Sequence, residues 1–317
     1  MKAHLVSVLT PVYNGESHIA RLLDSVLGQT YPHIEMILVD DGSTDATVQI
    51  AEAYVPKFKE KGYSLTILPA AHKNASAAIN KGLPYVKGEY LVWPDSDDEL
   101  LPDSVEVRVR FLQRHPEHQC VRSVMEYVSG DDGAPVKPAE RLGDLTKTEI
   151  FLDVLEGKSF VCCGCYMLKT EPFFCIYPLR KIPEYDVGQN FQMLLPFLYQ
   201  HQCPTIDQTL YRVYVRPDSH SRHSLTKQED VARYKQFEQL VDEIAEICKV
   251  KDLAILLRIA LWKTRRRGYL AKKYHSFIKY MICSVKIACL VLMLKMISCF
   301  RRGRKTQPRA KTGSRGL

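Results

Sequence analysis

The sequence predicts an α/β domain with a mostly parallel central sheet, followed by a helical, basic segment that associates with a membrane. Short apolar runs alternate with helix-period segments over the first hundred residues, as expected for parallel strands joined by crossover helices. Acidic clusters directly follow two of these runs. The charge is also unevenly distributed along the chain. Residues 251–317 contain 18 Lys and Arg and one acid, a net charge of +17. Because the whole chain carries +8, the first 250 residues carry −9.

The first half of the chain contains four expected strands separated by three expected helices. The first run ends at Pro11, which cannot continue a central ladder, and Asp45 is placed to cap a helix. The expected strands are 5–10, 35–39, 64–68 and 89–93, and the expected helices are 16–27, 45–59 and 74–83.

The second half mixes helices and strands and ends in helices only. The expected helices are 102–114, 146–155 and 189–200. The expected strands are 119–127, an apolar stretch that ends at 169, and 205–215. Residues 129–143 are expected to form a surface loop. We expect a catalytic domain over 1–225, a helical basic extension over 226–300 and a disordered basic tail over 301–317.

The start of the chain and its cysteines predict a cytosolic environment. The first apolar stretch is too short for a signal peptide. The ten cysteines lie in apolar runs of a large chain, so we expect reduced thiols. Cys162, Cys163 and Cys165 lack paired C-x-x-C spacing and a histidine partner, which favours buried packing over a metal site.

The acidic clusters, residues 40–45 and 95–98, follow the expected strands 35–39 and 89–93. Parallel strands deliver such residues to one edge of the sheet, where open α/β sheets bind ligands. Crowded carboxylates there repel each other unless a cation joins them, and hard oxygen ligands suit Mg²⁺ or Mn²⁺ carrying a diphosphate. The pattern therefore predicts a site for a metal-bound nucleotide.

Each cluster also has a simpler interpretation. Residues 40–45 are turn formers, and Asp45 need do no more than cap a helix. Residues 95–106 place acids at EF-hand positions, but Leu100 stands where that loop needs glycine and a strand precedes it. The calcium-loop interpretation is therefore disfavoured.

The order of motifs resembles family 2 glycosyltransferases of the GT-A fold, in particular a bacterial surface-polysaccharide branch. The resemblance covers about Val6 to Asp98 and continues more loosely through 188–196 and 211–222. It implies a Rossmann-like domain that binds a nucleotide sugar. The motifs that carry it are Pro11-Val12-Tyr13-Asn14, Asp40 to Asp45, Gly88-Glu89-Tyr90 and Asp95-Ser96-Asp97-Asp98.

The resemblance also implies roles for individual residues. Asp41 accepts a hydrogen bond from a uracil-type imide, while Asp40 is a structural partner. Asp97 binds Mg²⁺ or Mn²⁺, and Asp95 contacts the ribose or the metal. The ion neutralises charge on the departing nucleoside diphosphate. The implied nucleotide-sugar contacts are Pro11, Tyr13, Asn14, Asp41, Asp95, Ser96, Asn190 and Arg216.

An inverting transfer needs a base that removes the acceptor hydroxyl proton. The family usually supplies an acid just before an apolar helix, but Gln189 and Asn190 stand there, and neither is a base. The nearest carboxylates are Asp186, which we favour, and Glu184. The other interpretation is that both are solvated loop charges and the two amides hold acceptor hydroxyls.

The segment from Tyr211 to Arg222 contains Arg216 and His220. By the resemblance, its cations cover the diphosphate and His220 completes the metal shell. The alternative is a solvated loop.

The apolar run from Tyr280 to Phe300 is about long enough to span a bilayer at roughly 20 residues. Lys286 and Lys295 oppose insertion, and basic clusters flank the run. We therefore expect a helix on the cytoplasmic membrane surface, attracted to anionic lipid, rather than a span or a soluble helical pair. No specific nucleic acid partner is expected, because the tail lacks interleaved aromatic residues.

Together these features predict a metal-dependent inverting glycosyltransferase. Its donor would be a nucleoside diphosphate sugar, expected to be a UDP-sugar, and its acceptor a saccharide or lipid-linked saccharide of surface polysaccharide. One alternative is a sugar-nucleotidyltransferase, although the Gly-rich, Lys/Arg-bearing phosphate loop that this class needs after the first strand is missing at 11–15. The other is a non-catalytic nucleotide-sugar-binding protein at the membrane.

Overall fold

The computed structural model describes residues 2–137, 142–215 and 225–305. Contacts divide the chain into two compact units. The first comprises Met1–Thr226 and Asp242–Cys248, and the second comprises Lys227–Val241 and Lys249–Leu317. Helix α8, Lys227–Ile247, therefore contributes to both.

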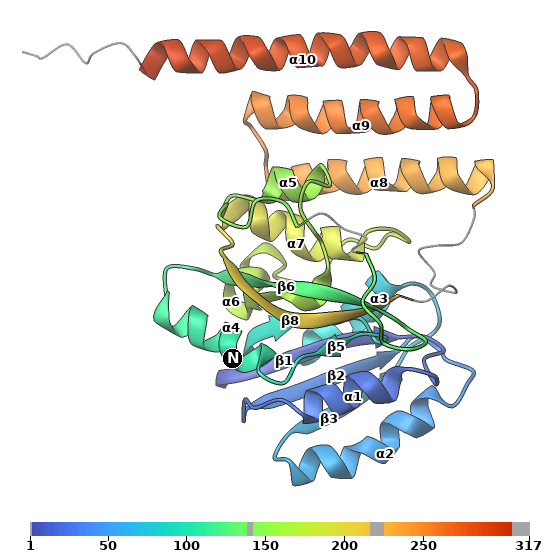
Figure 1. Cartoon of the computed structure of the whole chain (residues 1–317), viewed down its shortest axis with the longest axis vertical. Helices are drawn as coiled ribbons and strands as arrows, with labels where there is room; N and C mark the ends of the chain where they lie inside the picture. The colour runs from blue at the N-terminus through green and yellow to red at the C-terminus, as the bar shows by residue number, and fades with distance from the viewer. Residues whose placement is uncertain (1, 138–141, 216–224, 306–317) are drawn as a thin grey trace, which may run out of the picture. The chain divides into compact units, whose positions relative to one another are not determined.

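The first unit is built on one eight-stranded sheet with the order β3-β2-β1-β4-β7-β6-β8-β5 (Figure 1). Strands β3, β2, β1 and β4 run parallel, β7 is antiparallel to both neighbours, β6 and β8 are parallel, and β5 is antiparallel to β8. The predicted mostly parallel α/β fold is confirmed. The strands are β1 Lys2–Val12, β2 Ile34–Asp40, β3 Ser64–Pro69, β4 Gly88–Val92, β5 Glu99–Leu100, β6 Cys120–Ser129, β7 Tyr166–Lys169 and β8 Thr205–Val215.

The helices of the first unit connect these strands. Helix α1 packs beside α2, and α2 packs against β3 (Figure 1). Helix α3 lies directly on β1 and β2, because a Cβ on Gly82 would come within 2.3 Å of Leu9 Cδ1 and 2.9 Å of Val39 Cγ2. These helices are α1 Ile19–Leu27, α2 Thr47–Glu60, α3 Ala75–Gly82, α4 Ser104–Arg114, α5 Phe151–Leu155, α6 Thr170–Ile176 and α7 Gln189–Gln200, with 3₁₀ turns at Leu83–Tyr85 and Cys163–Cys165.

The core follows the apolar runs of the sequence. Every residue of β2 is buried, which matches a parallel strand covered on both faces. The nine cysteines with described side chains are free, and Cys162, Cys163 and Cys165 are buried, as expected. Packing rather than disulfide bonding therefore holds these segments.

Several expected elements differ from the structure. The first strand, expected to end at Pro11, continues through it to Val12, with Pro11 opposite Val39 in the parallel register. The helix expected over 146–155 is only α5, because Asp144 accepts hydrogen bonds from the backbone and hydroxyl of Thr146 and forms a turn there. The strand expected through 169 begins only at Tyr166. Strand β5 and helix α6 were not predicted, since two residues are too few to show a period and α6 follows β7 without a break.

The second unit contains α9, Leu253–Lys273, and α10, Phe277–Lys305. Helix α10 runs five residues past the expected boundary at 300, and 306–317 lie outside the described residues. Helix α10 packs against α9 at Gly268, where a Cβ would lie 3.4 Å from Cys283 Cβ and 4.0 Å from Ile287 Cδ1. The glycine allows the two helices to approach closely.

Candidate active site

The carboxyl ends of β1, β2 and β4 carry the motifs found in the sequence. In the parallel register Val12 pairs with Asp40, so Tyr13 and Asp41 follow neighbouring strands at the same edge. Strand β4 lies on the other side of β1, with Val92 opposite Val8, and leads into the second acidic cluster. The sheet therefore gathers both clusters along one edge, as the sequence predicts.

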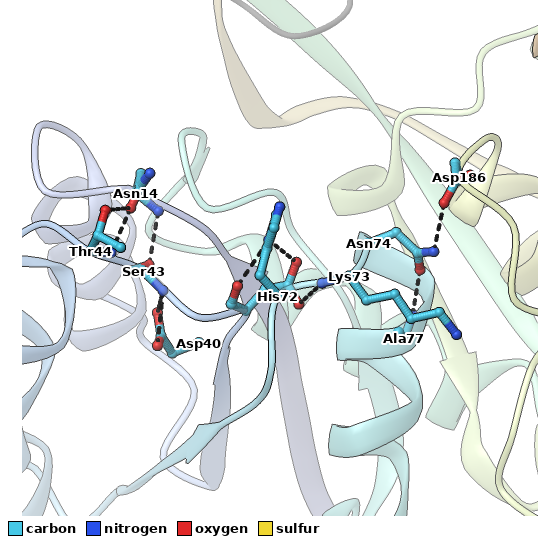
Figure 2. A network of polar contacts seen from close by, with 10 residues as sticks. Asn14, Asp40, Ser43, Thr44, His72, Lys73, Asn74, Ala77 and Asp186 are labelled. Atoms are coloured by element: carbon cyan, nitrogen blue, oxygen red, sulfur yellow. Dashed lines mark hydrogen bonds and ion pairs between the residues drawn. The ribbon is translucent and has the colours of Figure 1, made fainter.

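Asn14 joins the loops after β1 and β2. Its backbone has a φ of 48°, a left-handed conformation that asparagine tolerates better than most residues. The Asn14 N–H donates to Ser43 Oγ at 2.8 Å, and Asn14 Oδ1 accepts from the Thr44 N–H at 2.9 Å (Figure 2). Asp45 accepts from the Thr47 N–H at 3.0 Å, but the N-cap position of α2 is Ala46, so the helix begins one residue later than a cap at Asp45 would place it. These bonds fix both loops.

The two acids after β2 have different surroundings. Asp40 is buried and accepts from the Ser43 N–H at 3.2 and 3.3 Å, which is the structural role expected for it. The Asp41 side chain is only 6% exposed. Its Oδ1 accepts from the Lys73 N–H at 3.1 Å, and its Oδ2 lies 3.0 Å from His72 Nδ1. The Asp41 carboxylate therefore faces the segment that follows β3.

Tyr13 and His72 form a stacked pair beside Asp41. Their ring centroids lie 3.9 Å apart at an interplanar angle of 17°. Tyr13 is 36% exposed and the His72 side chain is 53% exposed, so the stacked pair lies at the surface. An aromatic ring next to a hydrogen-bonding carboxylate can bind a planar base.

The second acidic cluster contains one buried and two half-buried carboxylates. Asp98 accepts from Tyr211 Oη at 2.9 Å and from the Tyr214 N–H at 3.0 Å. Burial, followed by the charges of Asp97 and Asp95, raises the pKa of Asp98 well above its ordinary value. Asp98 thus anchors the loop to β8, and the half-buried Asp95 and Asp97 stay accessible.

Arg21 of α1 also holds this loop. Its Nη1 donates to the Asp97 carbonyl oxygen at 3.0 Å, and its guanidinium lies 3.6 Å from the centre of the Tyr214 ring. The main chain of Asp97 is therefore fixed independently of its carboxylate.

Asp95 and Asp97 suit a divalent cation that keeps open coordination positions. Among the described residues, no group of three or more His, Cys, Asp and Glu is arranged to hold a metal ion. Two carboxylates are nevertheless enough for Mg²⁺-like ions, which usually retain waters and phosphate oxygens. Burial is the main cause of the raised pKa of Asp98, and the charges of Asp97 and Asp95 add to it, so negative charge is concentrated here. His220 and Arg216 lie outside the described residues.

Helix α3 supports the loop that carries the candidate bases. Asn74 caps α3 by accepting from the Ala77 N–H at 2.9 Å, and its Nδ2 donates to Asp186 Oδ1 at 2.9 Å (Figure 2). Ser76 Oγ donates to the Tyr185 carbonyl oxygen at 3.1 Å. Asn80 exchanges hydrogen bonds with the backbone of Ile182 at 2.7 and 2.9 Å. The loop is thus fixed at several points.

Asp186 is better suited than Glu184 to accept a proton. Glu184 pairs with Lys73 and, at 3.1 Å, with Lys181. The hydrogen bond from Lys73, followed by that from Lys181, lowers the pKa of Glu184 from 4.5 to about 2. A carboxylate stabilised in this way is a weak base. Asp186 is exposed and bonded to a neutral amide.

Glu184 is expected to stabilise the fold in a pH-dependent way. Its folded-state pKa is lowered, so its contribution is complete above about pH 4.5 and is lost as the pH falls through about 2. Glu184→Gln should lower the urea midpoint at neutral pH, and the difference from wild type should vanish near pH 2. Glu52→Gln, at an exposed position of α2, is the control. A difference that stays constant with pH would contradict the ion-pair role.

The start of α7 connects this loop to the acidic cluster. Asn190 Oδ1 accepts from Trp93 Nε1 at 3.3 Å, and Trp93 precedes Asp95 by two residues. Gln189 begins α7 after Gly188, which has a left-handed φ of 65°. The amides at 189 and 190 therefore stand at the site, although neither can serve as a base.

Some contacting residues were not identified from the sequence. His72 and Tyr211 gave no local signal, since each meets its carboxylate through a pairing distant in sequence. Asn74 was foreseeable as a helix cap, because asparagine before an apolar-periodic segment is a common start signal.

Comparison with known proteins finds similar folds and a sequence family. Solved structures show a similar fold. TarS 1–349 of S. aureus, in complex with UDP-GlcNAc, aligns over 94% of this chain and 92% of its own, with a TM-score of 0.55 and 17% identity. The mannosyltransferase PcManGT of Pyrobaculum calidifontis, with GDP-Man and Mn²⁺, aligns over 93% and 79%, with a TM-score of 0.57 and 17% identity.

Sequence relatives point the same way. The putative glycosyltransferase EpsE of Bacillus subtilis is 28% identical over 222 residues, covering 70% of this chain and 77% of its own. The putative teichuronic acid biosynthesis glycosyltransferase TuaG of the same species is 38% identical over 133 residues, covering 42% and 50%. The family model for glycosyl transferase family 2 matches residues 7–176, more than half of the chain. That span contains both acidic clusters and the Tyr13 loop, and the chain belongs to glycosyl transferase family 2.

Proposed function

We propose that the protein is a metal-dependent, inverting glycosyltransferase that uses a UDP-sugar. The observation that carries this proposal is the shared edge of the sheet, where Tyr13 and Asp41 flank one end and Asp95 and Asp97 follow β4. A nucleotide sugar would need an aromatic ring and a carboxylate for its planar base, as Tyr13 and Asp41 supply, and then carboxylates for its ribose and metal-bound diphosphate, as Asp95 and Asp97 supply. TarS bound to UDP-GlcNAc and PcManGT bound to GDP-Man and Mn²⁺ support it through their common fold.

The nucleotide would lie along the loops after β1, β2 and β4. Asp41 would accept a base N–H, and the half-buried Pro11 and Ser96 would line the path between base and diphosphate. Asp95 and Asp97 would hold Mg²⁺ or Mn²⁺, which when bound neutralises charge on the leaving diphosphate. Arg216 and His220 stay predicted contacts of the diphosphate and the metal.

The acceptor hydroxyl would be deprotonated by Asp186. As its oxygen bonds to the anomeric carbon and the diphosphate oxygen departs from the opposite side, the proton passes to an Asp186 carboxylate oxygen. Asn190 would contact the nucleotide sugar, since its contact with Trp93 holds it beside the acidic cluster. Inversion follows from a single displacement.

The acceptor would be a saccharide or lipid-linked saccharide of cell-surface polysaccharide. Support comes from the relative TuaG, whose name refers to teichuronic acid biosynthesis. We test the function by mixing purified protein with radiolabelled UDP-sugars, Mn²⁺ and membrane extract. Label transferred to lipid supports the proposal, and label only in a new sugar nucleotide supports a nucleotidyltransferase. Binding without turnover, unchanged by Asp186→Asn, supports a non-catalytic protein.

We further propose that α10 attaches the protein to the cytoplasmic face of the membrane without spanning it. Residues 277–298 form a 22-residue stretch of mean hydropathy 2.0, none of it buried, and long enough by length and composition to cross a bilayer. The side facing α9 holds Cys283 and Ile287, whereas Val285 and Leu292 on the other side are 61% and 59% exposed. Part of the apolar surface therefore has no cover within the described residues.

The lysines of α10 favour attachment over insertion. At about 100° per residue, Lys286 and Lys295 lie about 180° apart and so at the two borders of the outer apolar face. A helix lying in the interface can bury that face while both lysines extend to lipid phosphates. A spanning helix would place them within the hydrocarbon.

The outer face of α10 should govern vesicle binding. Full-length protein is expected to sediment with phosphatidylglycerol vesicles more than with phosphatidylcholine vesicles. Leu292→Glu should weaken binding at least about tenfold, because burial of a leucine contributes about 1.5–3 kcal/mol. Val55→Glu, at an exposed apolar position of α2, should bind normally. Protein that resists alkaline extraction would instead indicate a span.

A further inference from the structure

His72 makes the two contacts that a nucleobase would make at this site. Its ring stacks on Tyr13 at 3.9 Å. Its Nδ1 lies 3.0 Å from Asp41 Oδ2 and 3.1 Å from the Asp41 carbonyl oxygen. Both oxygens are acceptors, so Nδ1 carries the proton and donates. The imidazole thus supplies a flat ring and an N–H donor, as a base with an imide would.

His72 and a base cannot use Tyr13 and Asp41 at the same time. Stacked rings need roughly 3.5 Å per gap, so a ring inserted between Tyr13 and His72 would require about twice the observed separation. The Nδ1 of His72 also occupies the Asp41 oxygen that a base N–H would approach. Binding of a base in this position therefore requires the imidazole to leave.

The surroundings allow the side chain to leave while the backbone stays. The His72 side chain is 53% exposed, so it can rotate into water. Its backbone packs on Gly42, where an added Cβ would lie 3.0 Å from the His72 nitrogen, and Gly42 has a left-handed φ of 77°. The Lys73 N–H donates to Asp41 Oδ1 next to it. Side-chain rotation is thus the movement with the fewest contacts to break.

We propose that His72 is an internal substitute for the nucleobase, which closes the base subsite of the free enzyme and is displaced by the donor. This inference rests on the proposed nucleotide-sugar function. In the closed state Oδ2 of the nearly buried Asp41 carboxylate keeps a hydrogen-bond donor in addition to the Lys73 N–H on Oδ1, which avoids the cost of leaving Oδ2 unpaired. Only a ligand that offers both a stacking ring and an N–H can replace both contacts, so His72 imposes a requirement for the base.

The substitution His72→Ala tests this role by calorimetric titration of the full chain with UDP and with GDP in the presence of Mn²⁺. Apparent affinity is proportional to the open fraction, so if the site is open for about a tenth to a third of the time, removal of the imidazole should tighten binding of the preferred nucleotide by about three- to tenfold. Inorganic pyrophosphate, which has no base, should bind equally to both proteins. His33→Ala, at an exposed histidine before β2, should leave nucleotide affinity unchanged.

A second variant checks that the effect acts through the stack. Tyr13→Ala should weaken nucleotide binding, and His72→Ala should give little further tightening in that background. Weaker or unchanged nucleotide binding by His72→Ala alone would overturn the inference while leaving the proposed function intact. If wild type binds neither UDP nor GDP, the proposed function itself fails.

Discussion

Replacement of Asp97 by asparagine is expected to lower kcat/KM for sugar transfer by about a thousandfold, equivalent to about 4 kcal/mol of transition-state stabilisation. Asparagine keeps the size of the side chain but removes the charge that would hold the cation. The backbone should not move, because Arg21 is bonded to the carbonyl oxygen of residue 97 and Asp98 anchors the loop to β8. The loss should therefore appear in activity and not in folding.

The measurement compares initial rates at saturating Mn²⁺ and the thermal midpoints of the two proteins. Asp131→Asn, at an exposed position of the loop after β6, removes the same charge away from the site and should retain full activity. Turnover by Asp97→Asn that matches wild type and resists a chelator would refute the metal assignment and the placement of the diphosphate.

Asp186→Asn should lower kcat by about a hundred- to ten-thousandfold, the range typical of a lost general base. The asparagine oxygen can still accept from Asn74 Nδ2, so the loop on α3 should keep its conformation. Affinity for UDP should change little, because the donor contacts lie on other loops. The effect should therefore be confined to the transfer step.

Glu184→Gln provides the comparison within the same loop. It removes a carboxylate two residues away whose pairing with Lys73 and Lys181 makes it a weak base. Its kcat should stay within a few-fold of wild type. Loss of activity in Glu184→Gln together with normal activity in Asp186→Asn would reverse the assignment. Normal activity in both would show that neither carboxylate of this loop is the base.

Local signals were sufficient to predict most of the first half of the fold. The apolar runs of β2 and β4 are typical of parallel strands buried on both faces, whereas the edge strand β3 alternates between exposed and more buried positions. Helix α7 and strand β8 begin and end at the residues that the sequence predicted. Asp41 directly follows β2, and Asp95 and Asp97 come three and five residues after the end of β4, so the ends of these strands bring them to the predicted edge.

Contacts between distant segments could not be predicted in this way. Asp98 resembled its acidic neighbours in the sequence, but only the pairing of β5 with β8 brings Tyr211 to it and buries it. His72 meets Tyr13 and Asp41 only after β3 has docked beside β2. Lys286 and Lys295 are nine residues apart, and from the sequence alone this spacing indicated a poorly amphipathic helix. The packing of α9 against α10 shows which side of α10 is covered, and the two lysines then border the uncovered side.

The short stretch from His72 to Asn80 touches both halves of the reaction. At one end the imidazole covers the proposed nucleotide contacts, and two residues later Asn74 holds the carboxylate proposed to deprotonate the acceptor. Because only the His72 side chain would turn aside when the donor binds, the hydrogen bond from Asn74 to Asp186 would stay in place. The proposed base would therefore be oriented before the donor arrives, and donor binding would not have to rebuild the acceptor side.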